Sequence, residues 1–155
     1  MRCPATRGER GQTLTEFAIV LPIFLLIVFG AIDLGRVIWA ADSLANAARE
    51  GARFASVHGD AEIVTTATKA DIRDETMHYL VAAGTNVTVN VCYSAVAFAS
   101  STVGCSGDTD EAGAGNTRGN LVTVAITADV PLLTGSLLGL PGFTVRGAST
   151  ALINN

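Results

Sequence analysis

The stretch GQTLTEFAIVLPIFLLIVFGAI, residues 11–32, determines how the rest of the chain is interpreted. Its one charged residue is Glu16, and the sixteen residues Phe17–Ile32 carry no charge. In a helix they span roughly 24 Å, at about 1.5 Å each, which is less than the roughly 30 Å of a hydrocarbon layer. Flanking residues must complete the span, so Glu16, Asp33 and Arg36 lie near its two ends. Asp33 and Arg36 are spaced i, i+3, and we expect them to pair and partly neutralise each other. We therefore predict a membrane-spanning helix.

The residues before this stretch predict its orientation. Residues 1–11 carry three arginines and one glutamate, a net charge of +2, which leaves −6 for residues 12–155 of a chain whose total is −4. Positive charge before a span and little after it keeps the N-terminus in the cytoplasm. Everything after Asp33 is then extracytoplasmic. The mildly acidic body also argues against nucleic acid as a partner.

A secretory signal peptide has the same basic and apolar regions, but it needs a small-x-small cleavage site after the apolar run. Residues 30–31 fit such a site weakly. Helix-forming residues continue beyond them without a break, and apolar residues recur at helical spacing from Leu34 to Ala48. We predict a single helix from about Leu14 to Phe54, which Pro22 bends or loosens without ending it.

Three blocks in the first third of the chain carry a family resemblance. They are GQTLTEFAIVLPIF at residues 11–24, IDLGR at residues 32–36 and NAAREGAR at residues 46–53. In this order they resemble the TadE-like family, the minor pseudopilins of the tight-adherence (Flp) pilus system, whose N-terminus is like that of type IV pilins. The resemblance implies a non-enzymatic protein that takes part in assembling a pilus for surface attachment. It implies as partners the membrane, a prepilin peptidase, other pilin or pseudopilin subunits and the pilus assembly platform.

The same resemblance assigns roles to three residues at the start of the helix. Gly11 is the last residue of a basic leader, and Gln12 is the first residue after cleavage. Glu16 is a charge that pairs with the freed amino group of its own or a neighbouring subunit. A carboxylate and an ammonium group are each costly in a low-dielectric medium and tolerable together. Snorkelling of Glu16 to the membrane surface is the alternative explanation.

This interpretation divides the chain into a basic leader (1–11), a transmembrane and exported helix (12–57) and an extracytoplasmic α+β domain (58–155). The expected location is the cytoplasmic (inner) membrane, crossed once, with association with the pilus as a further option. Trp39 lies where the helix leaves the bilayer, which suits an interfacial anchor. A role in the core is the alternative for this residue.

Small residues recur every four positions in the exported part of the helix, at Ala47, Gly51 and Ala55. They form a smooth strip where another helix can approach closely. Either another subunit occupies this strip, or the helix packs it against its own domain.

The remainder of the chain predicts the α+β domain. Asp60 is a candidate N-cap for a second helix from Ala61 to about Ala83, and Gly84 ends it. Three segments with strand patterns follow, and we expect them to form an antiparallel sheet: Asn86–Tyr93, Leu121–Ala128 and Phe143–Ile153. The apolar segment Leu132–Gly142, broken by glycines and a proline, is expected to form a packed loop or a short helical turn.

The cysteines fit an exported domain. Cys3 lies in the leader, so its removal leaves Cys92 and Cys105. An extracytoplasmic location permits a disulfide between these two residues, which would close a short loop. Two free buried thiols are the alternative.

The sequence contains no recognisable catalytic or metal-binding constellation. His58 and His78 have no further ligand at zinc-site spacing, and no G-x-S-x-G motif surrounds Ser106 or Ser149. The glycine-rich loop contains the acidic residues Asp108, Asp110 and Glu111. They lack the ligand order of an EF-hand, so we expect a solvated loop and no calcium site. We expect no enzymatic activity, cofactor or metal. A membrane-anchored extracytoplasmic binding module that is not incorporated into a pilus is the alternative function.

Overall fold

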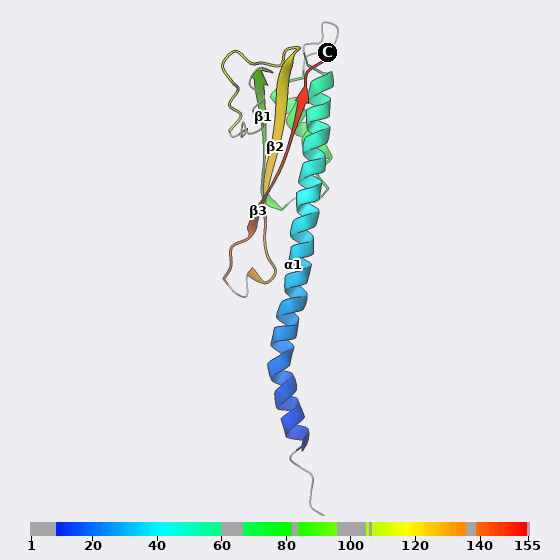
Figure 1. Cartoon of the computed structure of the whole chain (residues 1–155), viewed down its shortest axis with the longest axis vertical. Helices are drawn as coiled ribbons and strands as arrows, with labels where there is room; N and C mark the ends of the chain where they lie inside the picture. Colours follow the sequence, from blue (N-terminus) through cyan, green and yellow to red (C-terminus); the bar gives the residue numbers. More distant parts are fainter. Residues whose placement is uncertain are drawn as a thin grey trace, which may run out of the picture.

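The computed structural model describes residues 9–59, 67–81, 84–95, 105, 107–135 and 139–154. Two helices precede three strands along the chain: α1 (Glu9–Val57), α2 (Lys69–His78), β1 (Thr85–Ala95), β2 (Asn120–Val130) and β3 (Phe143–Leu152). The strands form one antiparallel sheet in the order β1-β2-β3. The predicted α+β class is thereby confirmed. Figure 1 shows the sheet beside the C-terminal half of α1, with the N-terminal half of the helix extending beyond it.

Helix α1 runs through 49 residues without interruption. Proline removes one backbone hydrogen bond from a helix interior, yet the helix continues past Pro22, as expected for a helix that lies in a bilayer. The single long helix predicted from the sequence is confirmed. It begins at Glu9 rather than near Leu14 and ends at Val57 rather than Phe54.

The core lies between the sheet and the second half of α1. Cross-strand neighbours on the inner face are Val89 with Ile126, Val91 with Val124 and Tyr93 with Val122, and all six are buried. These are the inward positions that the alternating pattern predicts. Burying each large aliphatic side chain contributes about 1.5–3 kcal/mol. The helix covers this face with a strip of mostly alanine residues: Ala40, Leu44, Ala47, Ala48, Ala52 and Ala55.

The C-terminal part of the inner face of β3, from Gly147 onward, is lined by small residues, which allows the strand to cross α1 at close range. Gly147 lies opposite Ile126 in the sheet. A Cβ at this position would lie 2.6 Å from the carbonyl carbon of Leu44 and 2.7 Å from the backbone nitrogen of Ala45. Glycine is therefore required here by the neighbouring backbone.

Helix α2 is shorter than the sequence pattern predicts. The expected start at Ala61 is wrong, because residues 67–68 are not helical and Thr68 is the N-cap. The Thr68 Oγ1 accepts a hydrogen bond from the Asp71 amide at 3.3 Å, and the Asp71 carboxylate accepts one from the Thr68 amide at 2.8 Å. This capping box fixes the first turn. The proposed N-cap, Asp60, lies outside the described residues.

The far end of α2 also differs from the prediction. The helix ends at His78 with Tyr79 as its C-cap, before the expected end near Ala83. Gly84 does not cap the helix but precedes β1, where an added Cβ would collide with the carbonyl group of Asp129. The residue therefore serves the close approach of β1 and β2.

A disulfide joins Cys92 in β1 to Cys105 in the loop between β1 and β2, with a Cα–Cα distance of 5.6 Å. Together with Ala125 in β2, these residues form a small buried cluster on the outer face of the sheet. The loop is thereby attached to the face that α1 does not cover.

Candidate functional site

The residues assigned to processing lie together at the start of α1. The peptide bond between Gly11 and Gln12 is within the helix, and the Gln12 Nε2 donates a hydrogen bond to the Glu16 Oε1 at 3.3 Å. All three residues are exposed, and no atom outside the adjacent residues and the nearby helix backbone lies within 4 Å of a Cβ placed on Gly11. A protease could reach this bond, but it would have to unwind the helix locally. Glycine eases that step because it destabilises a helix by about 1 kcal/mol relative to alanine.

The apolar half of α1 is bare. Between Leu14 and Ile32 the large apolar side chains are exposed, including Phe17 at 60% and Ile27 at 63%. Within the described parts of the chain, this is the one helix long and apolar enough to cross a membrane. An exposed apolar surface of this length is compatible with a helix that lipid or other apolar helices surround.

Asp33 marks the point where α1 meets its own domain. Only 3% of the residue is exposed, and its carboxylate accepts three hydrogen bonds from the loop between β2 and β3. They come from the Leu133 amide at 2.8 Å, the Thr134 amide at 2.9 Å and the Thr134 Oγ1 at 2.7 Å. Hydrogen bonds to an ionised acceptor are among the strongest in proteins. Asp33 therefore links the loop to the helix. Its buried carboxylate finds its hydrogen-bond partners within the protein.

Arg36 adds a second contact between α1 and the loop between β2 and β3. Its Nη1 lies 3.6 Å from the Asp33 Oδ1 and donates to the Pro131 carbonyl at 3.4 Å. The i, i+3 pairing of Asp33 with Arg36 expected from the sequence is confirmed. Sequence spacing gives no indication of the loop contacts, because Thr134 lies 101 residues from Asp33.

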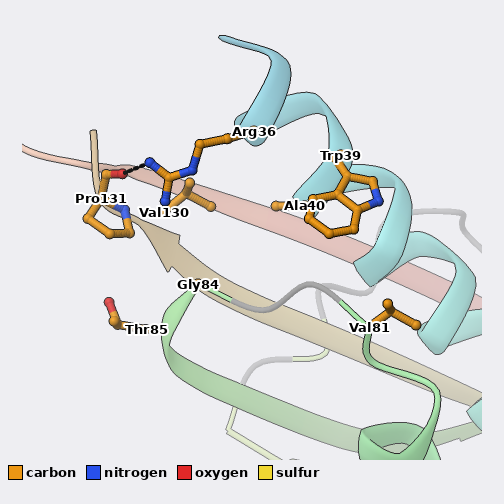
Figure 2. A pocket seen from close by; sticks show the side chains of 8 residues that line it. All are labelled: Arg36, Trp39, Ala40, Val81, Gly84, Thr85, Val130 and Pro131. Carbon is orange, nitrogen blue, oxygen red and sulfur yellow. Dashed lines mark hydrogen bonds between the residues drawn. The ribbon is translucent and has the colours of Figure 1, made fainter. Parts of the chain in front are cut away.

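Beside these contacts of Asp33 and Arg36, a hollow of about 350 Å³ opens between α1 and the adjoining ends of β1 and β2. Figure 2 shows Arg36 and Trp39 projecting from α1 at its rim, with Val130 and Pro131 from the end of β2 on one side. Trp39 is 60% exposed, so the alternative of a core role is wrong. A guanidinium and an indole on one stretch of helix suit the level of lipid headgroups.

The strip of small residues faces the protein's own domain in this structure. Ala47 and Ala55 are fully buried, and Gly51 is buried against α2. The nearest atoms to a Cβ added at Gly51 belong to the side chain of Thr76. Of the two alternatives for this strip, the structure shows packing within the chain. A contact of these residues with another subunit remains a prediction.

The β1–β2 loop is exposed or half-buried at Asp108, Asp110 and Glu111, as a solvated loop would be, but these three acidic residues also bind the edge of the sheet. Their carboxylates accept hydrogen bonds from alternate amides of β1: Val91 to Asp108 at 2.7 Å, Tyr93 to Asp110 at 3.0 Å and Ala95 to Glu111 at 3.0 Å. Because β1 is an edge strand, these amides would otherwise be open to pairing with another chain. The carboxylates occupy the place of a fourth strand.

Basic residues of α2 neutralise this acidic edge. The Lys69 Nζ lies 2.7 Å from the Asp110 Oδ1, and Arg73 pairs with Asp108. The Arg73 Nε also donates to the Val89 carbonyl at 3.1 Å. Burial, with the charge of Asp110 nearby, raises the pKa of Tyr93 to about 12. The cluster is thus a set of structural ion pairs around a neutral tyrosine.

The described residues contain no group of three or more potential metal ligands. The ring of His58 stacks on Phe54, with 4.3 Å between the ring centroids, and its Nδ1 lies 3.0 Å from the Phe54 carbonyl oxygen. His78 lies at the end of α2, where its ring meets Tyr79 edge to face. His58 is thus held by packing, His78 is exposed at the helix end, and Ser106 lies outside the described residues.

Comparison with known proteins gives one positive finding. Residues 11–53 match the model of the family described as TadE-like protein. The match begins at Gly11, covers the apolar half of α1 and the Asp33–Arg36 pair, and ends two residues after Gly51. The resemblance seen in the three sequence blocks is therefore confirmed for this segment. Neither the curated proteins nor the solved structures include a significant match.

Proposed function

We propose that this chain, whose first helix matches the TadE-like family, is a non-enzymatic pseudopilin-like protein that takes part in assembling a tight-adherence (Flp type IV) pilus. In this proposal α1 crosses the cytoplasmic membrane once, with its N-terminus in the cytoplasm. A prepilin peptidase cuts after Gly11, and the sheet domain lies outside the membrane.

The observation that carries this proposal is the bare apolar half of α1 with a single acid at its start. The first hydrogen bonds of the described domain to α1 are at Asp33, and the large apolar side chains between Leu14 and Ile32 are exposed and available to lipid and to other helices. Glu16 lies one helical turn after Gln12, and the two side chains are already in contact. Cleavage would place a new ammonium group within reach of that carboxylate. The pair would then offset the cost of burying either charge.

Two glycine variants provide the test. A Cβ placed on Gly11 or on Gly35 meets nothing within 4 Å beyond the adjacent residues and the nearby helix backbone. Both residues lie in α1, so Gly11→Ala and Gly35→Ala add the same methyl group to the same helix without a clash. In cells that assemble the pilus, Gly11→Ala should retain the leader and lose surface pili. Gly35→Ala should be processed and assemble normally.

The opposite outcome separates the two candidate functions. If Gly11→Ala leaves both membrane localisation and pilus formation intact, the chain is an anchored extracytoplasmic binding module and the pseudopilin proposal is wrong. Glu16→Gln tests the charge separately, because it keeps a side chain that can still hydrogen-bond to Gln12. We expect this variant to be cleaved but not assembled.

A further inference from the structure

The loop between β2 and β3 has an unusual composition for a surface turn. Its sequence from Pro131 to Phe143, PLLTGSLLGLPGF, contains no charged residue. Among its described residues, Leu133, Leu140 and Phe143 are 53%, 53% and 57% exposed. Loops that face water are normally built from polar turn residues together with glycine and proline. Three large apolar side chains this exposed therefore indicate another environment.

The loop lies at the end of the sheet nearest the apolar half of α1 (Figure 1). Leu140 and Phe143 line an apolar hollow of about 510 Å³ together with Gly30, Leu34 and Val37 of the helix. The loop and the helix thus share one apolar surface, which continues directly into the bare residues of α1.

The length of α1 fixes the level of this surface in a bilayer. About 20 helical residues cross the roughly 30 Å hydrocarbon layer. A span that starts at Phe17, after Glu16, therefore ends near Arg36. Gly30 is then roughly 9 Å inside the boundary, at about 1.5 Å per residue. Leu140 and Phe143 lie beside this part of the helix, which places them at the outer edge of the hydrocarbon layer.

The same depth explains why Asp33 is enclosed. A carboxylate three residues inside the end of the span would be costly against lipid. The loop supplies three hydrogen bonds to it and covers it, so that 3% of the residue remains exposed. The uncharged run that ends at Ile32 is too short to cross the bilayer alone. The loop provides apolar surface where the helix becomes polar.

We propose that Leu140 and Phe143, at the described C-terminal end of the β2–β3 loop, insert into the outer leaflet of the membrane that α1 spans and contact lipid acyl chains. The inference rests on the membrane insertion of α1 in the proposed function. Lipid is the occupant because the surface is uncharged, continuous with the bare helix and level with its end. Arg36 and Trp39 lie at the adjoining rim, where headgroups begin (Figure 2). Helix and loop together fix the tilt of the domain on the bilayer.

Tryptophan fluorescence in vesicles tests this proposal. The full chain is reconstituted into phosphatidylcholine and phosphatidylglycerol vesicles, with or without bromine on the acyl chains, after Trp39→Phe removes the natural indole. Phe143→Trp and, independently, Leu140→Trp report on the loop. Ile27→Trp is the reference inside the bilayer, at a position 63% exposed, and Val57→Trp is the reference at the far end of α1, at a position 55% exposed.

The proposal predicts that both loop indoles lose fluorescence to brominated lipid to a degree comparable with the Ile27→Trp reference, while the Val57→Trp reference does not change. Quenching at Ile27→Trp without quenching at either loop position would overturn the loop insertion and leave the anchor intact. Loss of quenching at Ile27→Trp as well would refute the membrane anchor itself. In a further outcome, the loop indoles are not quenched by brominated lipid, but their emission wavelength shifts with the protein-to-lipid ratio. This result would assign the surface to contact with a second copy of the chain and would also overturn the proposal.

Discussion

Replacing Gly51 with alanine tests whether the strip of small residues on α1 packs within the chain. The added methyl group would overlap the hydroxyl of Thr76 and lie 3.1 Å from its Cβ and 3.4 Å from its Cγ2. Thr76 is fully buried and its hydroxyl donates to the Ile72 carbonyl, so it cannot rotate away without losing that hydrogen bond. Overpacking of this kind costs about 1–3 kcal/mol. The gain in helix propensity is about 1 kcal/mol.

We therefore expect Gly51→Ala to lower the free energy of unfolding by up to about 2 kcal/mol in the natural background. In a Thr76→Ala background the hydroxyl is gone, and the same change should become neutral or stabilising. Urea unfolding of the detergent-solubilised full chain, followed by circular dichroism, measures both effects as shifts in midpoint at constant slope. The cycle should show a coupling of about 1–3 kcal/mol between the two sites. If the two changes are additive within about 0.5 kcal/mol, the close contact between α1 and α2 does not exist.

Three further predictions concern the stability of the domain. Gly147→Ala should destabilise it by about 2–3 kcal/mol, because its methyl group would meet the backbone of Leu44, which cannot repack as a side chain can; calorimetry that finds no change would refute this crossing geometry. Cys92→Ser combined with Cys105→Ser opens a loop with a sequence separation of 13 and should cost about 3 kcal/mol in urea unfolding, whereas a reducing agent should affect only the natural chain. Hydrogen bonds from Thr68 hold the pKa of Asp71 below its usual value of 3.8, so the unfolded state binds a proton more readily than the folded state. The stabilisation from this carboxylate is therefore lost as the pH falls below about 4, and Asp71→Asn should weaken the acid dependence of the urea midpoint.

Local patterns in the sequence are sufficient for most of the fold. Helical spacing of apolar residues predicts α1, and alternation predicts the buried faces of β1 and β2, including Val91 and Val124. These features depend on neighbours along the chain, so the sequence displays them directly. The start of α2 also has a local signal, the threonine and aspartate spacing of a capping box at Thr68, but Asp60 offers a competing N-cap signal earlier in the chain.

The parts that sequence reasoning misses depend on contacts between distant residues. The sequence pairs Asp33 with its neighbour Arg36, whereas its main partners come from Leu133 and Thr134. The acids of the β1–β2 loop are expected to be solvated. Their carboxylates also accept hydrogen bonds from amides at the edge of the sheet, as Asp108 does from Val91. Charge and composition identify such residues as unusual, but only the fold identifies their partners.

The proposed function requires that α1 is inserted with a basic cytoplasmic leader and is used after that leader has been removed. Mass spectrometry of the protein extracted from membranes of peptidase-competent cells tests this requirement most directly. We predict a mature chain that begins at Gln12, and a Gly11→Ala chain that keeps residues 1–11. A natural chain that is recovered with its leader intact, or with any other first residue, would contradict it.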